Sequence, residues 1–485
     1  GEPIVFPLKE KITLRIDAYK PPSNAVADYN EYEIFQELEK RTNVHIEWTV
    51  HDNSTKTEKL NLMAASGEYP DAIYGAQPDG YMLSSWAEQG IAIPLNDLID
   101  KYAPNLKRIF EENPKYREIV THGDGKIYSL PIITERPFNE APDTMFINKK
   151  WLDKAGLPLP ATMDELYEAL KAFKDADMNE NGINDEIPMS FLFRDHWRGG
   201  HSLAMAWDVM DHMYTHTYIK DGEVLYAPMQ EGYRKYAEFM HKLYKEGLLD
   251  PELFTQDANV YRAKIRGEFP ILGVAFYSSK AGFSNTDDYV PLIGLKGPDG
   301  HAGWTWDRPG IQHGGFVITS ANKHPEITMA WIDSHYDFEM SLQLYAGPFG
   351  KGINKISDNK YEPIPLPQGM NVYAIAPEWP APKYIPARTY TEDIFVPPND
   401  VEQMNYFFLK QPYLKYTPPK YKIYDTQDYE KLDTINEINS KNGYIDQTFA
   451  DFVINGVTDE KWNSHLQQLK KFGIEEYLQI VAKYE

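Results

Sequence analysis

The fold is decided by residues 12–75, a stretch that begins ITLRIDAYKPP and ends ASGEYPDAIYG. Strand-forming residues dominate Ile12 to Tyr19, and Val44 to Val50 alternates between apolar and polar side chains, so each is predicted to be a strand. A third, short strand is predicted over 71–75. The segments between these strands have the apolar spacing of helices. Strands that alternate with helices in this way predict an α/β fold with a largely parallel sheet.

The segments that follow two of these strands are candidates for ligand binding. In sheets of parallel strands, ligands gather at the carboxyl ends of the strands. The residues after Tyr19 and after Tyr74 are polar and aromatic, and we expect them on the ligand side of the molecule.

The composition describes a large globular chain with an acidic surface. Its 485 residues exceed one ordinary core and favour two or three lobes. The formal net charge is -23, and no block of Lys and Arg offers a stripe to phosphates, so we expect no nucleic acid partner. The chain has no cysteine, which excludes disulfides and zinc-thiolate sites and suits a protein exported across a membrane. We expect its export signal to have been removed.

Helix signals continue through the middle and the end of the chain. A helix over 149–155 is predicted to stop at Gly156, and a capping box that begins at Thr162 starts the next helix. The last residues, 459–485, have helical spacing with a break at Gly473. Prolines interrupt any regular element between residues 363 and 419, where we expect a long ordered loop or a chain of short turns.

The sharpest local signal is DMNENGINDE at residues 177–186. Oxygen-bearing side chains stand at its first, third and fifth positions, a glycine follows for a tight turn, and acids close the stretch, as a hard cation such as calcium requires. Pro188 stands where a full EF-hand has a bidentate glutamate. We therefore expect a structural calcium ion, with a turn that binds no metal as the alternative. The predicted ligands are Asp177, Asn179, Asn181, the Ile183 carbonyl, Asp185 and Glu186.

Five further segments together carry a resemblance to a known protein family. They are LMAASG at 62–67, IPLNDLI at 93–99, FINKKWLDKAGL at 146–157, PATMDEL at 160–166 and YKEGLLDPE at 244–252. These segments resemble the bacterial extracellular solute-binding proteins, and most closely the large oligosaccharide-binding lipoproteins that include the alginate-binding proteins. In that subgroup a calcium-binding Asp-x-Asn-x-Asn-Gly loop ends in Asp-Glu-Ile-Pro, as residues 185–188 do here.

The resemblance implies a periplasmic-binding-protein-like α/β fold, with two lobes that close on a ligand in the cleft between them. Residues 1–135 with 305–375 would form the first lobe, and residues 136–304 with 376–485 the second, which carries the calcium loop. The chain would be the substrate-binding component of an ABC importer and no enzyme. It would capture an oligosaccharide and deliver it to a membrane permease. We expect a monomer at the extracellular face of the cell membrane, lipid-anchored, or in the periplasm.

An oligosaccharide site needs flat aromatic side chains for the sugar rings and planar polar side chains for the hydroxyls. Trp197 and Arg198 stand in a polar turn where a core tryptophan would be out of place. Trp304 and Trp306 share one face of an extended segment. The resemblance places Tyr277 at an aromatic ligand contact. The candidate ligand contacts are Tyr19, Arg136, Trp197, Arg198, Tyr277, Trp304, Trp306, Arg308, Trp379 and Arg388.

Two other functions stay open. A peptide-binding importer component would also use aromatic residues and Asp–Arg pairs. A glycoside hydrolase would need two carboxylates across one bond, for which Glu135, Asp195 and Asp307 are candidates. The sequence shows no spacing that pairs them and no serine-hydrolase, zinc-protease or ATP-binding motif.

Overall fold

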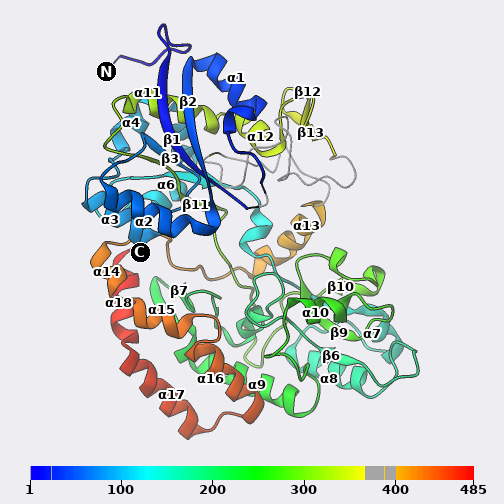
Figure 1. Ribbon diagram of the computed structural model, residues 1–485. Coiled ribbons are helices and arrows are strands. Elements are labelled where there is room, and N and C mark those ends of the chain that lie inside the picture. The colour runs from blue at the N-terminus through cyan, green and yellow to red at the C-terminus, as the bar shows by residue number, and fades with distance from the viewer. Residues whose placement is uncertain (1, 23, 366–386, 388–399) are drawn as a thin grey trace.

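The computed structural model describes residues 2–22, 24–365, 387 and 400–485. Two bodies lie one above the other in Figure 1, and each is built around its own β-sheet. Both chain ends in the figure belong to the upper body or to its border with the lower one.

The upper body contains a five-stranded sheet in the order β2-β1-β3-β11-β4. Its strands are β1 (Ile12–Lys20), β2 (Val44–Asp52), β3 (Ala72–Tyr74), β4 (Leu130–Ile133) and β11 (Ile311–Ile318). The predicted opening is confirmed, because β1 pairs in parallel with β2 and with β3, and helices α1 and α2 connect them. The helices of this body are α1 (Glu33–Thr42), α2 (Lys56–Ser66), α3 (Gly80–Glu88), α4 (Asn96–Tyr102), α5 (Pro104–Glu112), α6 (Pro114–Val120), α11 (Pro325–Asp333) and α12 (Phe338–Ala346).

The expectation of a largely parallel sheet is wrong for the strand β11. This strand enters the sheet from the lower body and runs antiparallel to both β3 and β4. Periodicity in the opening residues carries no information about a strand that joins the sheet from so far along the chain. A small hairpin of β12 (Ile353–Ser357) and β13 (Lys360–Pro363) follows on this body.

The lower body contains a four-stranded sheet in the order β10-β5-β9-β6. Only β6 and β9 pair in parallel, while β5 is antiparallel to both of its neighbours. The strands are β5 (Thr144–Asn148), β6 (Ile187–Met189), β9 (Leu272–Tyr277) and β10 (Tyr289–Pro291), and a separate hairpin is formed by β7 (Thr217–Lys220) and β8 (Glu223–Tyr226). The helices are α7 (Lys149–Ala155), α8 (Met163–Lys174), α9 (Glu231–Lys245), α10 (Ala258–Ile265), α13 (Asp400–Lys410), α14 (Thr426–Glu430), α15 (Asp433–Asn439), α16 (Tyr444–Asn455), α17 (Asp459–Phe472) and α18 (Ile474–Lys483).

The predicted helix boundaries are confirmed where a cap or a glycine sets them. The hydroxyl of Thr162 accepts a hydrogen bond from the Glu165 amide at 3.1 Å, which starts α8. Gly156 ends α7 in the left-handed region at φ 69°, and Gly473 separates α17 from α18 at φ 90°.

A helix inside the proline-rich stretch was not expected. Residues 400–410 form α13, because the interval between Pro398 and Pro412 holds no proline and carries apolar side chains at helical spacing. The described part of this stretch is therefore a helix followed by turns, and not turns alone.

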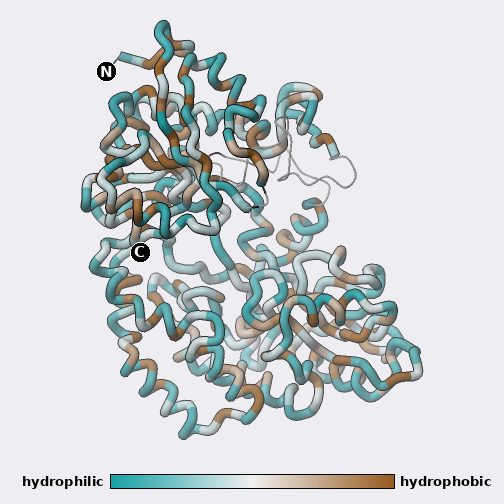
Figure 2. Tube along the Cα trace, in the orientation of Figure 1, coloured by the Kyte–Doolittle hydropathy of each residue, from teal (hydrophilic) through white to brown (hydrophobic). Residues whose placement is uncertain are grey.

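Each body has its own hydrophobic core, and apolar residues follow the strands and the inner helix faces in Figure 2. The chain passes between the bodies in residues 134–143, after β4, and in residues 292–310, before β11. Ile423 is fully buried in a cluster with Trp86 and Val317 of the upper body, so the segment before α14 lies on that body. This segment falls in the range expected for the second lobe.

No helix within the described ranges is long and apolar enough to span a membrane.

Lys410, at the end of α13, is only 1% exposed and donates a hydrogen bond to the Ala141 carbonyl at 2.7 Å. Burial lowers the pKa of Lys410 to about 7, although the nearby Asp143 carboxylate opposes the shift. An unfolded chain keeps this lysine protonated up to about pH 10.4, so between pH 7 and 10 the unfolded state binds more protons than the folded state. Stability therefore rises with pH in this window.

A Lys410→Met variant removes this titration while it keeps the length of the side chain. The free energy of unfolding of the native chain, minus that of the variant, is expected to rise by about 1 kcal/mol per pH unit between pH 7 and 9. Urea unfolding of both proteins across this range measures the difference. A difference that does not change with pH would contradict the assignment.

Candidate functional site

Three of the predicted ligand contacts lie together at the edge of the lower sheet. Arg198 donates from Nε and Nη2 to the two carboxylate oxygens of Asp195, both at 2.9 Å. The guanidinium carbon of Arg198 lies 5.7 Å from the centre of the Tyr277 ring, at the end of β9. The backbone amide of Trp197, which is half-buried, also donates to Asp195 at 3.0 Å. Asp195 therefore fixes both neighbours, and the arrangement presents an aromatic face beside a planar cation.

Two glycines close the loop that carries Trp197 and Arg198. A Cβ on Gly199 would lie 2.2 Å from the Asp195 carbonyl, and a Cβ on Gly200, at φ 74°, would lie 2.7 Å from the Phe191 ring. A larger residue would require the backbone to move at position 199, and at position 200 it would require the Phe191 ring to move and a strained φ. The turn therefore favours glycine at both positions.

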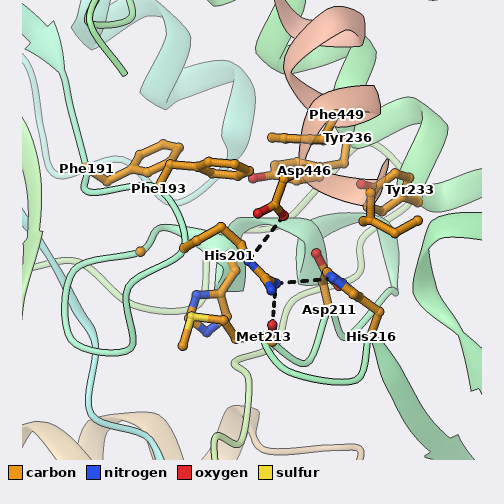
Figure 3. A pocket seen from close by; sticks show the side chains of 13 residues that line it. Phe191, Phe193, His201, Asp211, Met213, His216, Tyr233, Tyr236, Asp446 and Phe449 are labelled. Atoms are coloured by element: carbon orange, nitrogen blue, oxygen red, sulfur yellow. Dashed lines mark hydrogen bonds and ion pairs between the residues drawn. The ribbon is translucent and has the colours of Figure 1, made fainter. Parts of the chain in front are cut away.

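The other end of the loop is held by Arg194, which lines a small cavity of 30 Å³ in the lower body. Figure 3 shows Asp211, His216 and Asp446 around this cavity, with the Tyr236 and Phe449 rings above it. Such a volume holds water but no sugar ring. The cavity is therefore part of the scaffold of the loop.

Arg194 binds to three separate segments from a left-handed backbone conformation at φ 64°. Its Nε pairs with Asp446 of α16 at 3.1 Å, and its Nη2 donates to the carbonyl of Asn439, the last residue of α15, at 2.8 Å. Its Nη1 donates to the Met213 carbonyl. Burial raises the pKa of Asp446 against the opposing effect of Arg194. The C-terminal helices are in this way tied to the start of the loop.

A second polar network joins the loop to the segment before β11. The Nδ1 atom of His196 lies 3.1 Å from the carboxylate of Asp307, which is 3% exposed. The hydroxyl of Tyr421 donates to the Asp307 carbonyl at 2.9 Å and also contacts His212. Burial lowers the pKa of His212 to about 4. Arg308 is exposed, and its guanidinium carbon lies 5.9 Å from the centre of the Tyr214 ring.

The structure buries Trp304, one of the two indoles that were expected to share an open face. Trp304 is 2% exposed, lies in the lower core and donates from Nε1 to Asp143 at 3.2 Å. Trp306 lies on the same side, as alternation predicts, and packs partly against the same core. The shared face of the two residues is thus turned toward the core, and Trp304 has no surface for a sugar in this conformation.

The remaining predicted contacts lie apart from the Asp195 cluster. Tyr19 is 2% exposed and stacks on His51 with ring centres 4.8 Å apart, and burial raises its pKa. Arg136 lies 3.6 Å from the carboxylate of Asp400 and over the Tyr345 ring. Trp379 and Arg388 lie outside the described residues.

A cavity of 490 Å³ lies where the segment before β11 meets the carboxyl ends of the upper strands. A smaller cavity of 220 Å³ shares Arg308, Pro309 and Tyr421 with it. The larger cavity is lined by Lys56, Gln77, Pro78, Asp79, Ile119, Arg308, Pro309, Ile311, Gln312, His313, Tyr421, Lys422 and Tyr429. The residues after Tyr74 were expected on the ligand side, and Gln77 to Asp79 do border this cavity. Gln312 and His313 were missed, because no local pattern shows that β11 joins this edge.

The predicted calcium loop connects α8 to β6. Gly182 stands at φ 77°, and its amide donates to Asp177 at 2.9 Å, so the tight turn forms as predicted. The side-chain amides of Asn179 and Asn181 both face the Asp185 carboxylate, at 3.0 and 2.8 Å. The Oε2 atom of Glu186 is buried without a hydrogen-bond partner. Within the described ranges no three His, Cys, Asp or Glu side chains form a metal cluster, so any cation here depends on the two asparagines.

Comparison with known proteins defines the class of this chain. Residues 23–334 match the family described as bacterial extracellular solute-binding protein. The chain belongs to this family, which confirms the expected resemblance and the periplasmic-binding-protein-like fold.

Individual proteins and solved structures are also similar to this chain. The chain is 34% identical over 510 aligned positions to the fructooligosaccharide ABC transporter substrate-binding protein FusA of Streptococcus pneumoniae, covering 100% of this chain and 92% of FusA. The structure of FusA in complex with kestose matches with a TM-score of 0.77 at 32% identity, covering 97% of this chain and 98% of that one. An EF-hand mutant of FusA in complex with fructo-nystose matches with a TM-score of 0.76. The alginate-binding protein AlgQ2, solved without calcium ion, shares the fold with a TM-score of 0.66 at 21% identity.

An Asp446→Asn variant tests how far the C-terminal helices hold the loop. It leaves the buried guanidinium of Arg194 without its carboxylate, which is expected to lower the free energy of unfolding by about 3 kcal/mol. Chemical denaturation measures this loss.

The matched control is Asp451→Asn on the same helix, where the side chain is 45% exposed and pairs with Lys461. This variant is expected to change stability by less than about 1 kcal/mol. Equal losses in both variants would show that Asp446 has no special role.

Proposed function

We propose that this protein captures an oligosaccharide outside the cell and delivers it to the membrane permease of an ABC importer. The observation that carries the proposal is the 34% identity, across the whole chain, with a fructooligosaccharide substrate-binding protein. Family membership supports the same role. A fructooligosaccharide is the first ligand to test, because FusA, which aligns over the whole chain, is a fructooligosaccharide substrate-binding protein with a structure in complex with kestose.

The ligand binds between the two bodies. On the lower body, Tyr277 and Trp197 offer aromatic faces for sugar rings, and the Asp195–Arg198 pair offers hydrogen-bonding groups that are already oriented. Trp306 and Arg308 border the cavities beside the connecting segment. Arg136, Trp379 and Arg388 remain candidates, while Tyr19 and Trp304, each 2% exposed, have no surface for a sugar in this conformation. Contacts made only in the closed state would shift the equilibrium of the two lobes toward closure.

Sugar binding is favoured over the two alternatives, a peptide cargo and a glycoside hydrolase. Asp195 and Asp307, two of the candidate acids of a hydrolase, are each held by a basic neighbour, Arg198 and His196. FusA, which aligns over the whole chain, is an ABC transporter substrate-binding protein. A peptide remains the alternative cargo, since Asp–Arg pairs and aromatic faces suit it too. The protein acts as a monomer, lipid-anchored at the extracellular face of the membrane or free in the periplasm.

The loop at residues 177–186 binds a structural calcium ion. Carboxylates of Asp177, Asp185 and Glu186, amide oxygens of Asn179 and Asn181 and the Ile183 carbonyl are hard oxygen donors of the kind that calcium prefers. The unpartnered, buried Oε2 of Glu186 fits this assignment, because a cation would satisfy it. When bound, the ion would hold the connection between α8 and β6. The EF-hand mutant made in FusA supports a comparable loop in that relative.

A thermal-shift screen in fixed excess calcium tests the cargo. Kestose is expected to raise the melting temperature, whereas uronate oligosaccharides and short peptides are not, and chromatography should recover the kestose intact. A ligand present at 100 times its Kd stabilises the folded state by about 2.7 kcal/mol. Stabilisation by peptides alone would show that the cargo is a peptide. Cleavage of the sugar would show that the protein is a glycoside hydrolase.

An Asp177→Ala variant tests the calcium loop. The native chain is expected to melt at a lower temperature in chelator than in excess calcium, by the same mass-action stabilisation. The variant is expected to melt at the lower temperature in both conditions, because it lacks the first ligand.

The matched control is Asp175→Ala, an exposed aspartate just before the loop, which should keep the response to calcium. Identical melting of the native chain in calcium and in chelator would refute the site.

A further inference from the structure

The upper wall of the 490 Å³ cavity is made of polar side chains that no contact described so far explains. Gln77 and Asp79 follow β3, and Gln312 and His313 stand at the start of β11. The side chains of Gln77 and Gln312 hydrogen-bond to each other across these two segments. Planar amides and an imidazole at the rim of a cavity are groups that bind hydroxyls.

The backbone is distorted at the point where these side chains meet. The pairing of β11 with β4 shifts register between Gln312 and Phe316, which marks a bulge around His313. Gln77 has φ 47°, a conformation unusual for a residue with a side chain. Gly314 has φ 78° and approaches Pro78 so closely that a Cβ would lie 2.9 Å from its ring. Bulges beside binding sites re-aim side chains, and strained residues cluster at such sites.

His313 itself lacks a partner. Its Nδ1 is buried without a hydrogen-bond partner, and the side chain lines the cavity. Burial lowers the pKa of His313 to about 4, although Asp79 opposes the shift, so the imidazole is neutral at pH 7. A buried polar group without a partner destabilises the protein unless a ligand or water supplies one.

One positive charge around the cavity has no carboxylate beside it in the described part of the chain. Lys56 contacts the Gln77 carbonyl at 3.4 Å, and the negative charge of Asp79 acts on its ammonium group. The guanidinium of Arg308 lies 3.9 Å from the carboxylate of Asp307. Lys422 is the one lining cation beyond these pairs. The imidazole of His313 and the side-chain amides of Gln77 and Gln312 carry no charge and can bind hydroxyl groups.

We propose that His313, together with Gln77 and Gln312, forms a subsite on the upper body that binds the hydroxyl groups of a neutral sugar ring. The proposal rests on the proposed function and deepens it, because it adds a subsite on the upper body to the contacts proposed on the lower body and names the chemical class of the ligand. His313 contacts the ligand and selects for hydroxyls, and the bulge in β11 sets its position.

Calorimetric titration of kestose into the calcium-loaded, full-length chain tests the subsite. His313→Phe keeps a flat ring without hydrogen-bonding atoms and is expected to weaken the affinity for kestose about tenfold, the effect of one lost hydrogen bond. His313→Gln restores a donor and an acceptor and is expected to recover at least half of this loss on a logarithmic scale. A purely structural role would not give this recovery. His324→Phe, at an exposed histidine of the same body, is the control and should bind as the native chain does.

Each outcome separates the subsite from the proposed function. If the native chain binds kestose and His313→Phe, folded, binds it equally well, the subsite is wrong while the function stands. If the native chain binds neither a neutral nor a uronate oligosaccharide, the proposed function fails and the subsite fails with it. If the native chain prefers a uronate trisaccharide, the ligand is not neutral, but the proposed function stands.

A second variant keeps the test decisive if His313→Phe does not fold. Gln312 is exposed, so Gln312→Ala is not expected to disturb the core. It is expected to weaken kestose binding between about threefold and tenfold. Unchanged affinity would overturn the subsite.

Discussion

The segment from Trp304 to Ile311 has to satisfy two hydrophobic cores at once. Trp304 is buried in the lower core and Ile311 in the upper one, so the chain between them can neither lengthen nor shift without exposing one of them. Asp307 lies between these anchors and bonds to His196 and Tyr421 on either side. Arg308 and Pro309 of the same segment line both cavities beside it.

The loop that carries Trp197 is fixed by groups that are distant in sequence. Arg194 reaches the C-terminal helices at Asn439 and Asp446, while Asp195 organises the loop itself. A largely buried cation held by two carbonyls and one carboxylate depends on each partner, because loss of the carboxylate leaves its charge unpaired. The C-terminal helices thus serve the binding surface, although none of them borders the Tyr277 ring. Arg194 supports the loop whose side chains we propose as ligand contacts.

Much of the fold could be predicted from local sequence, and the failures share one cause. Thr162, Gly156, Gly473 and Gly182 each act on backbone within a few residues, so their caps and turns were predicted correctly. Trp304 shows the limit of periodicity, because alternation gives the face it shares with Trp306 and not whether that face is turned toward the core. The direction of β11, the helix α13 and the partners of Arg194 depend on contacts that a single sequence does not reveal. His313 was missed for the same reason.

The position of β11 in the upper sheet also has a consequence for how the chain folds. β3 ends at residue 74 and β11, its neighbour in the sheet, begins at residue 311, with the lower sheet formed by residues between them. A chain that emerges from its amino end therefore cannot complete the upper sheet until the lower body has largely appeared. Pairings of such long sequence separation form slowly. A protein that must stay unfolded while it crosses a membrane gains time from this order of strands.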